Sequence, residues 1–153
     1  MTRALATLLL LTLTLVGCGS SDSEKKTGKD KDGFSQAADT STCTADAQAF
    51  TGTVPANYPK DFPLPSGAVL YNVEDRGNDG AIGTAVVKAS LKDVLGVMNG
   101  TAQDAGFKVT GGETEEHDAE ANWTGNGFRG RWAIRESAKC DGEIVIQVLA
   151  KRQ

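Results

Sequence analysis

Asn126 and Gly127 constrain the fold of this chain more than any other short feature. Asn-Gly is the preferred centre of a type I′ turn, which joins two antiparallel strands through a two-residue loop. With these residues as the loop, the large apolar side chains of strands over 118–125 and 128–135 fall on one face. A shift of one residue would send that set to the other face, so the register is predicted together with the hairpin. The apolar pairs are Gly125 with Phe128, Trp123 with Gly130, Ala121 with Trp132, and Ala119 with Ile134.

The opposite face of this predicted hairpin is mostly polar. Its pairs are Thr124 with Arg129, Asn122 with Arg131, Glu120 with Ala133, and Asp118 with Arg135. Three arginines on one side of one strand form a candidate anion-binding or partner-binding face, extended by Lys151 and Arg152 near the chain end. The simpler interpretation is a solvated face that is neutralised by Asp118 and neighbouring acids.

A helix is predicted over residues 91–105. Apolar residues recur there at helical spacing, Ser90 is suited to cap the first turn, and Gly106 is a natural stop. Gly96 and Gly100 should each weaken the helix by about 1 kcal/mol relative to alanine. We therefore expect close packing of the helix on a sheet to compensate.

Short apolar runs predict the other strands, which lie over 69–73, 81–88, 107–110 and 143–150. The last of these strands is apolar on both faces, so it should be central in the sheet, or its second face should be covered.

Residues 44–50 can form a short helical turn. Four prolines between residues 55 and 65 favour an extended path, and we expect segment 50–65 to cover the second face of the last strand.

The order of elements predicts an α+β fold. We expect an antiparallel sheet of five to six strands in the order β-β-α-β-β-β, with one helix packed on a face. The chain has 153 residues, which suits one domain better than two.

The N-terminus has the layout of an export signal. Arg3 precedes an apolar run over residues 5–15, which is far shorter than the ~20 residues of a membrane-spanning helix. The next residues complete the motif Leu15-Val16-Gly17-Cys18, which resembles the lipobox of bacterial lipoproteins. The resemblance implies diacylglyceryl transfer to the sulfur of Cys18, cleavage before Cys18 and a lipid anchor with two or more chains. The rest of the chain resembles small uncharacterised secreted lipoprotein domains and no named family.

This resemblance also accounts for an odd number of cysteines. Three cysteines in an exported chain leave one without a partner. If lipid occupies Cys18, then Cys43 and Cys140 remain to form a disulfide around a loop of about 100 residues. Free thiols are unfavoured outside the cytoplasm, and the cysteines lack the ligand spacing of a metal site.

The signal, a tether and a domain divide the chain into three parts. Residues 1–17 form the signal peptide, residues 18–42 the lipidated cysteine and a disordered tether, and residues 43–153 the globular domain. Residues 19–33 contain no aliphatic or aromatic side chain, so they cannot offset the entropy cost of ordering. As a flexible coil, residues 19–42 would span roughly 25–30 Å. Lysines at positions 25, 26, 29 and 31 could reach lipid headgroups, but interleaved acids favour a solvated spacer.

Two other features invite functional readings. Trp123 and Trp132 could stack on carbohydrate, but their predicted inward face makes them core residues. His117 lies among acids and could support acid–base or metal chemistry. Neighbouring residues of an extended segment point to opposite faces, so a solvated loop histidine is the expected outcome.

Composition and motifs exclude several functional classes. A net charge of −4 gives no electrostatic reason to expect nucleic-acid binding. The sequence lacks the common nucleophile, phosphate-loop and zinc motifs, and it has one histidine.

We therefore expect a non-catalytic lipoprotein without cofactor or metal, held by lipid on the extracytoplasmic side of a membrane. Its domain should bind an envelope protein or polymer. A small-ligand carrier with a pocket between helix and sheet is the alternative, and a small hydrolase is a third.

Overall fold

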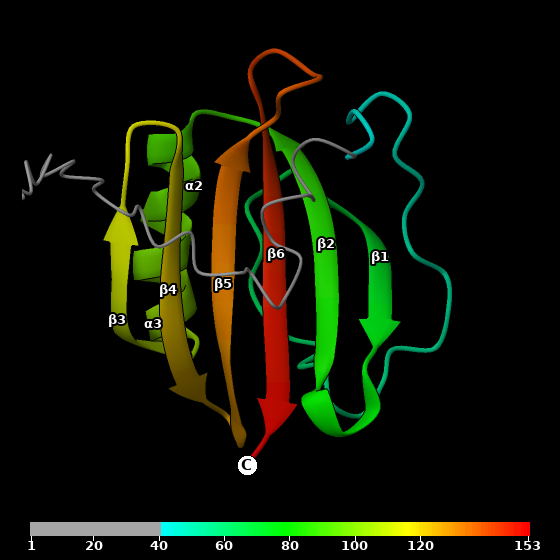
Figure 1. Cartoon of the computed structure of the whole chain (residues 1–153), viewed down its shortest axis with the longest axis vertical. Coiled ribbons are helices and arrows are strands. Elements are labelled where there is room, and N and C mark those ends of the chain that lie inside the picture. The colour runs from blue at the N-terminus through cyan, green and yellow to red at the C-terminus, as the bar shows by residue number, and fades with distance from the viewer. Residues whose placement is uncertain (1–40) are drawn as a thin grey trace, which may run out of the picture.

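The computed structural model describes residues 41–153, which form one six-stranded antiparallel sheet with a helix on one face (Figure 1). The predicted signal peptide, Cys18 and residues 19–40 of the tether lie outside the described residues. The strands lie in the order β1-β2-β6-β5-β4-β3. Their bounds are β1 Val69–Asp75, β2 Ala81–Lys88, β3 Lys108–Thr114, β4 Asp118–Gly125, β5 Phe128–Glu136 and β6 Glu143–Arg152. The predicted α+β class and the upper strand number are confirmed.

The hairpin of β4 and β5 has the predicted register. Asn126 and Gly127 form the loop with φ angles of 50° and 79°, as a type I′ turn requires. All eight predicted pairs are observed, from Gly125 opposite Phe128 to Asp118 opposite Arg135. Alternation along these strands therefore separates an inner face, which the helix covers, from an outer face.

The predicted helix is a single rod with an irregular middle. It consists of α2 (Leu91–Gly96), a π-helical turn over Val97–Thr101 and α3 (Ala102–Asp104). Ser90 caps its start, because the Oγ atom accepts a hydrogen bond of 3.1 Å from the backbone N–H of Asp93. The helix packs closely on the sheet through Val94, Met98 and Ala102, and its glycines take no part in this contact. A Cβ atom at Gly96 or Gly100 would meet no atom within 4 Å, since both glycines face solvent.

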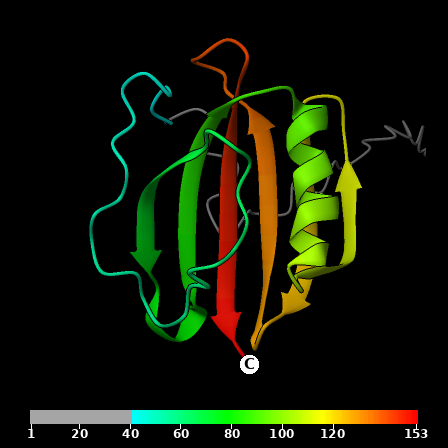
Figure 2. The ribbon, with the colours of Figure 1, turned by 180° about the vertical axis from the view of Figure 1, so that it is seen from behind.

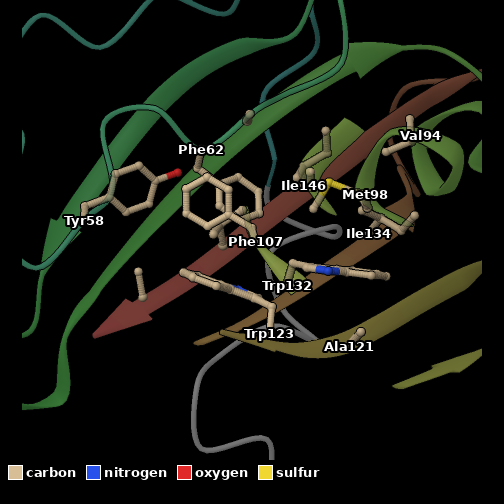
Figure 3. Packing of buried hydrophobic residues seen from close by; sticks show 14 of the residues in the cluster. Tyr58, Phe62, Val94, Met98, Phe107, Ala121, Trp123, Trp132, Ile134 and Ile146 are labelled. Carbon is tan, nitrogen blue, oxygen red and sulfur yellow. The ribbon is translucent and has the colours of Figure 1, made fainter. Parts of the chain in front are cut away.

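The inner core lies between the helix and the sheet (Figure 3). Val94, Met98 and Ala102 of the helix are fully buried against large residues of β4, β5 and β6. An aromatic cluster of Phe62, Phe107 and Trp123 extends this core, with ring centroids 4.9–5.5 Å apart. Such pairs contribute about 0.5–1.5 kcal/mol each beyond their buried area.

The prediction for the proline-rich segment 50–65 is wrong. β6 is central, between β2 and β5, as expected. Segment 50–65, however, covers the inner face beside the helix rather than the outer face (Figure 2). Tyr58 and Phe62 anchor it there, and Tyr58 lies directly on Gly83 of β2, where a Cβ atom would come within 2.3 Å of the phenol oxygen. Residues 44–46 form only a turn, not a longer helical segment.

The disulfide between Cys43 and Cys140 is present, with the Cα atoms 5.7 Å apart. It joins the start of the domain to the loop between β5 and β6 across 97 positions of sequence. Glu143 strengthens the same junction, since its carboxylate accepts a hydrogen bond of 2.8 Å from the backbone N–H of Thr44. Within residues 41–153, no helix is long and apolar enough to cross a membrane.

Two glycine substitutions should change stability in opposite directions. Gly96→Ala adds a methyl group to open space at a helical backbone position, so we expect the free energy of unfolding to rise by up to about 1 kcal/mol. Gly83→Ala should lower it, because the added atom collides with Tyr58. Urea unfolding followed by tryptophan fluorescence measures both changes. A loss of stability in Gly96→Ala would contradict the solvent-facing placement of this glycine.

Candidate anion-binding groove

The arginines of β5 project from the outer face, as the hairpin register predicted. Arg129, Arg131 and Arg135 alternate with the inward residues Phe128, Gly130, Trp132 and Ile134. Arg131 forms an ion pair with Glu120 of β4, and Arg135 lies 3.7 Å from a carboxylate oxygen of Asp118. Each side chain in these two pairs is about 26–31% exposed, so water screens the attraction only in part. Two of the three predicted arginines therefore have acidic neighbours on β4.

Arg129 is in a different environment. The pairing of β5 with β6 places Arg129 directly opposite Lys151 on the outer face. Two like charges at facing positions of an antiparallel pair repel each other. Within residues 41–153, neither side chain has a carboxylate within ion-pair distance. The fold therefore holds two cations together at one end of the sheet without a compensating acid.

A groove of about 570 Å³ surrounds these cations. Its lining includes Arg129, Arg131, Lys151, Leu149, Asn122 and Asp79. Asp79 comes from the turn between β1 and β2, and its carboxylate is the one acid in the lining. We call this hollow the cationic groove. Its guanidinium forks and amide donors suit the oxygen atoms of a phosphate or carboxylate group.

Arg152 does not belong to this groove, although the sequence placed it with Lys151. Its guanidinium carbon lies 5.0 Å from the centroid of the Phe128 ring on the inner side, and its Nε donates to the carbonyl oxygen of Ala56. Strand alternation explains the separation, because adjacent residues of β6 point to opposite faces.

Trp123 and Trp132 are core residues. Each is 2% exposed on the inner face, so neither ring can serve as a carbohydrate platform. The helix–sheet interface around them is also filled. Met98 and Ile146 are fully buried there, and Leu95 packs against the same cluster. Buried side chains therefore occupy the interface where the alternative of a small-ligand carrier placed its pocket.

A second hollow, of about 650 Å³, lies on the inner side at the end of the sheet away from the disulfide. Segment 53–61 forms one wall, and Phe107 and Phe128 form part of the other. Lys60, Asp61 and Arg152 also line it, so the site combines apolar and charged groups. No sequence pattern indicated this hollow, because a proline-rich loop forms most of it.

His117 lies in neither hollow. Its side chain is 70% exposed, and its Nδ1 atom lies 2.9 Å from the carboxylate of Glu136. The hydrogen bond to Glu136 raises the pKa of His117, and the charge of Glu116 adds to this shift. This arrangement brings the imidazole to carboxylates on the surface, not to a hydroxyl nucleophile in a cleft.

Among the described residues, one group has the spacing of metal ligands. Cys43, Cys140 and Glu143 place their ligand atoms within 4.8 Å of one another. The two sulfur atoms are joined in the disulfide, so they offer no thiolate to a metal ion.

Comparison with known proteins identified no matching family model, no matching curated protein and no matching solved structure. The geometry of the domain and the sequence of the chain are therefore the basis for any functional proposal.

The surroundings of His117 predict its titration. We expect its pKa to lie above the usual value for histidine, because Glu136 and Glu116 stabilise the protonated ring. Glu136→Gln should lower this pKa, since it removes the charged partner of the hydrogen bond. The imidazole resonances in NMR spectra recorded across a pH series measure both values. Equal midpoints in the two proteins would show that the contact with Glu136 is not formed in solution.

Proposed function

We propose that this chain is a lipid-anchored lipoprotein of the bacterial cell envelope whose domain is a non-catalytic binding module. The cationic groove on the outer face of the sheet would bind an anionic group of an envelope protein or polymer. The like-charged pair of Arg129 and Lys151 is the observation that carries this proposal. The anchor rests on the N-terminal sequence, with Arg3, the apolar run over 5–15 and Cys18 in the order of a lipoprotein signal.

Electrostatics favours an anionic ligand at this groove. A bound anion would remove the repulsion between Arg129 and Lys151, so part of the binding free energy comes from relief of an unfavourable contact. Arg131 at the same wall already pairs with Glu120, which keeps the net charge of the groove moderate.

The single histidine of the chain lies outside both hollows with Glu116 and Glu136 as neighbours. The disulfide supports an extracytoplasmic location, because disulfides persist in oxidising compartments.

A small-ligand carrier is the alternative function. The hollow beside segment 53–61 favours it, since Phe107 and Phe128 offer an apolar wall for an amphiphilic molecule. Binding in that hollow would be insensitive to substitutions on the outer face, and this difference distinguishes the two functions.

Lys151→Glu should stabilise the fold and weaken anion binding at the same time. It replaces a repulsive pair with an attractive pair opposite Arg129, worth roughly 0.2–1 kcal/mol of added stability. Binding of soluble polyphosphate at low salt, followed by calorimetry, should weaken by at least about fivefold, because the substitution turns one cation of the groove into an anion. Lys92→Glu, on the exposed side of the helix, is the matched control of equal charge change. Equal losses in both variants would reject the groove as the binding site.

The lipid anchor is tested separately with Cys18→Ser. This variant should leave the membrane fraction and appear in the soluble envelope fraction, because no thiol remains to carry the lipid. The domain should still fold, with the disulfide between Cys43 and Cys140 intact on non-reducing gels. A cleaved variant that stays with the membrane would show that another part of the chain holds it there.

A further inference from the structure

The hollow beside segment 53–61 has the size and the walls of a small-molecule site. Its volume of about 650 Å³ lies within the range of about 300–1,000 Å³ that is usual for such sites. Val54, Pro55, Phe107 and Phe128 supply apolar surface to its walls. All of its lining residues lie between positions 53 and 152, in the part of the chain that the structure describes. The hollow can therefore take up the apolar part of a small organic molecule.

The loop that forms one wall of the hollow is anchored at several points. Tyr58 and Phe62 belong to the inner core and are 4% and 6% exposed (Figure 3). The backbone N–H of Tyr58 donates to the carbonyl oxygen of Pro55 at 3.0 Å, which closes a turn within the wall. The backbone N–H of Phe62 donates to the carbonyl oxygen of Pro59 at 3.2 Å and closes a second turn. The wall is thus formed before a ligand arrives, so binding does not bear the entropy cost of ordering the loop.

Arg152 contributes a positioned cation to the lining. Its guanidinium carbon lies 5.0 Å from the centroid of the Phe128 ring, and its Nε donates a hydrogen bond of 2.8 Å to the carbonyl oxygen of Ala56. Within residues 41–153, its two terminal nitrogen atoms have neither a hydrogen-bond acceptor nor a carboxylate partner. These N–H groups form the fork that binds a carboxylate through two parallel hydrogen bonds. The ring and the loop therefore orient a fork that is available to a ligand.

The charges around the hollow favour an anion over a cation. Lys60 and Arg152 are the cations of the lining and Asp61 is its acid, so the lining carries a net charge of +1. Tyr58 adds no negative charge at neutral pH, because burial raises the pKa of its phenol. The side-chain amide of Asn126 is engaged elsewhere, since it donates to the carbonyl oxygen of Ala105 at 3.0 Å. Asp61 therefore lowers the affinity for an anion without reversing the preference.

We propose that this hollow binds an amphiphilic carboxylate, with its apolar part against Phe107 and Phe128 and its headgroup on the guanidinium of Arg152. This ligand class rests on the alternative function of the domain as a small-ligand carrier, and it is independent of the cationic groove. The apolar walls contribute affinity through buried area, whereas Arg152 selects the headgroup and fixes its orientation. A molecule without a charged headgroup would gain only the contribution of the walls.

Three probes of equal chain length test the headgroup preference. Decanoate carries a carboxylate, decanol a neutral hydroxyl and decyltrimethylammonium a cation, and each is titrated into the full chain by calorimetry below its micelle-forming concentration. Decanoate should bind at least about tenfold more tightly than decanol, because its headgroup forms charge-assisted hydrogen bonds. Decyltrimethylammonium should bind more weakly than decanol. Equal affinities for decanoate and decanol, or tightest binding of the cation, would overturn the proposal.

Arg152→Gln separates the contribution of the headgroup from that of the walls. It should weaken decanoate binding by at least about tenfold and change decanol binding by no more than about twofold. Asp61→Asn should strengthen decanoate binding by about twofold, since it removes the acid of the lining. Lys139→Gln, in the exposed loop between β5 and β6, is the matched control for the loss of one positive charge and should change neither affinity. A parallel loss of both ligands in Arg152→Gln would show that this arginine only supports the wall, and would reject it as the headgroup site.

A substitution on the outer face distinguishes this hollow from the cationic groove. Lys151→Glu should weaken polyphosphate binding and change decanoate binding by no more than about twofold, because adjacent residues of β6 point to opposite faces. A loss of decanoate affinity as large as that of polyphosphate would place the ligand on the outer face and reject the hollow as its site. Failure of decanoate to bind while polyphosphate still binds would reject the proposal for the hollow and leave the function of the cationic groove intact.

Discussion

In the two-residue turn at Asn126 and Gly127, both residues adopt positive φ angles, and this conformation fixes which residues of β4 and β5 face each other. The register sends Trp123 and Trp132 inward, where they meet Phe62, Met98 and the rest of the inner core. A slip of one residue would replace these indoles by arginines and acids. The attachment of the helix and the proline-rich segment therefore depends on this short turn.

The same alternation that builds the inner core also places cations outward. β5 presents three arginines to the outer face, and β4 provides acids beside two of them. β6 adds Lys151 opposite the remaining arginine, and the resulting repulsion is a local cost to stability. A contact that weakens the fold and faces a groove is typical of a binding surface, because a ligand can recover the lost free energy.

The disulfide between Cys43 and Cys140 connects the two halves of this organisation. It holds the start of the domain at the loop between β5 and β6. The proline-rich segment then leaves along β1 and crosses to the inner face, where Tyr58 occupies the space above Gly83. One covalent link thus sets the starting point for the chain that covers the inner core.

Local sequence determined the hairpin register, the capped helix, the two apolar faces of β6 and the outward direction of the arginines. These features follow from side-chain periodicity and turn chemistry, which act over a few residues. The tertiary structure decided that segment 50–65 covers the inner face, that Arg152 turns away from Lys151, and that Lys151 faces Arg129. These outcomes depend on the order of strands and on the path of an irregular segment. Both are set by contacts between residues far apart in sequence, and no local pattern encodes them.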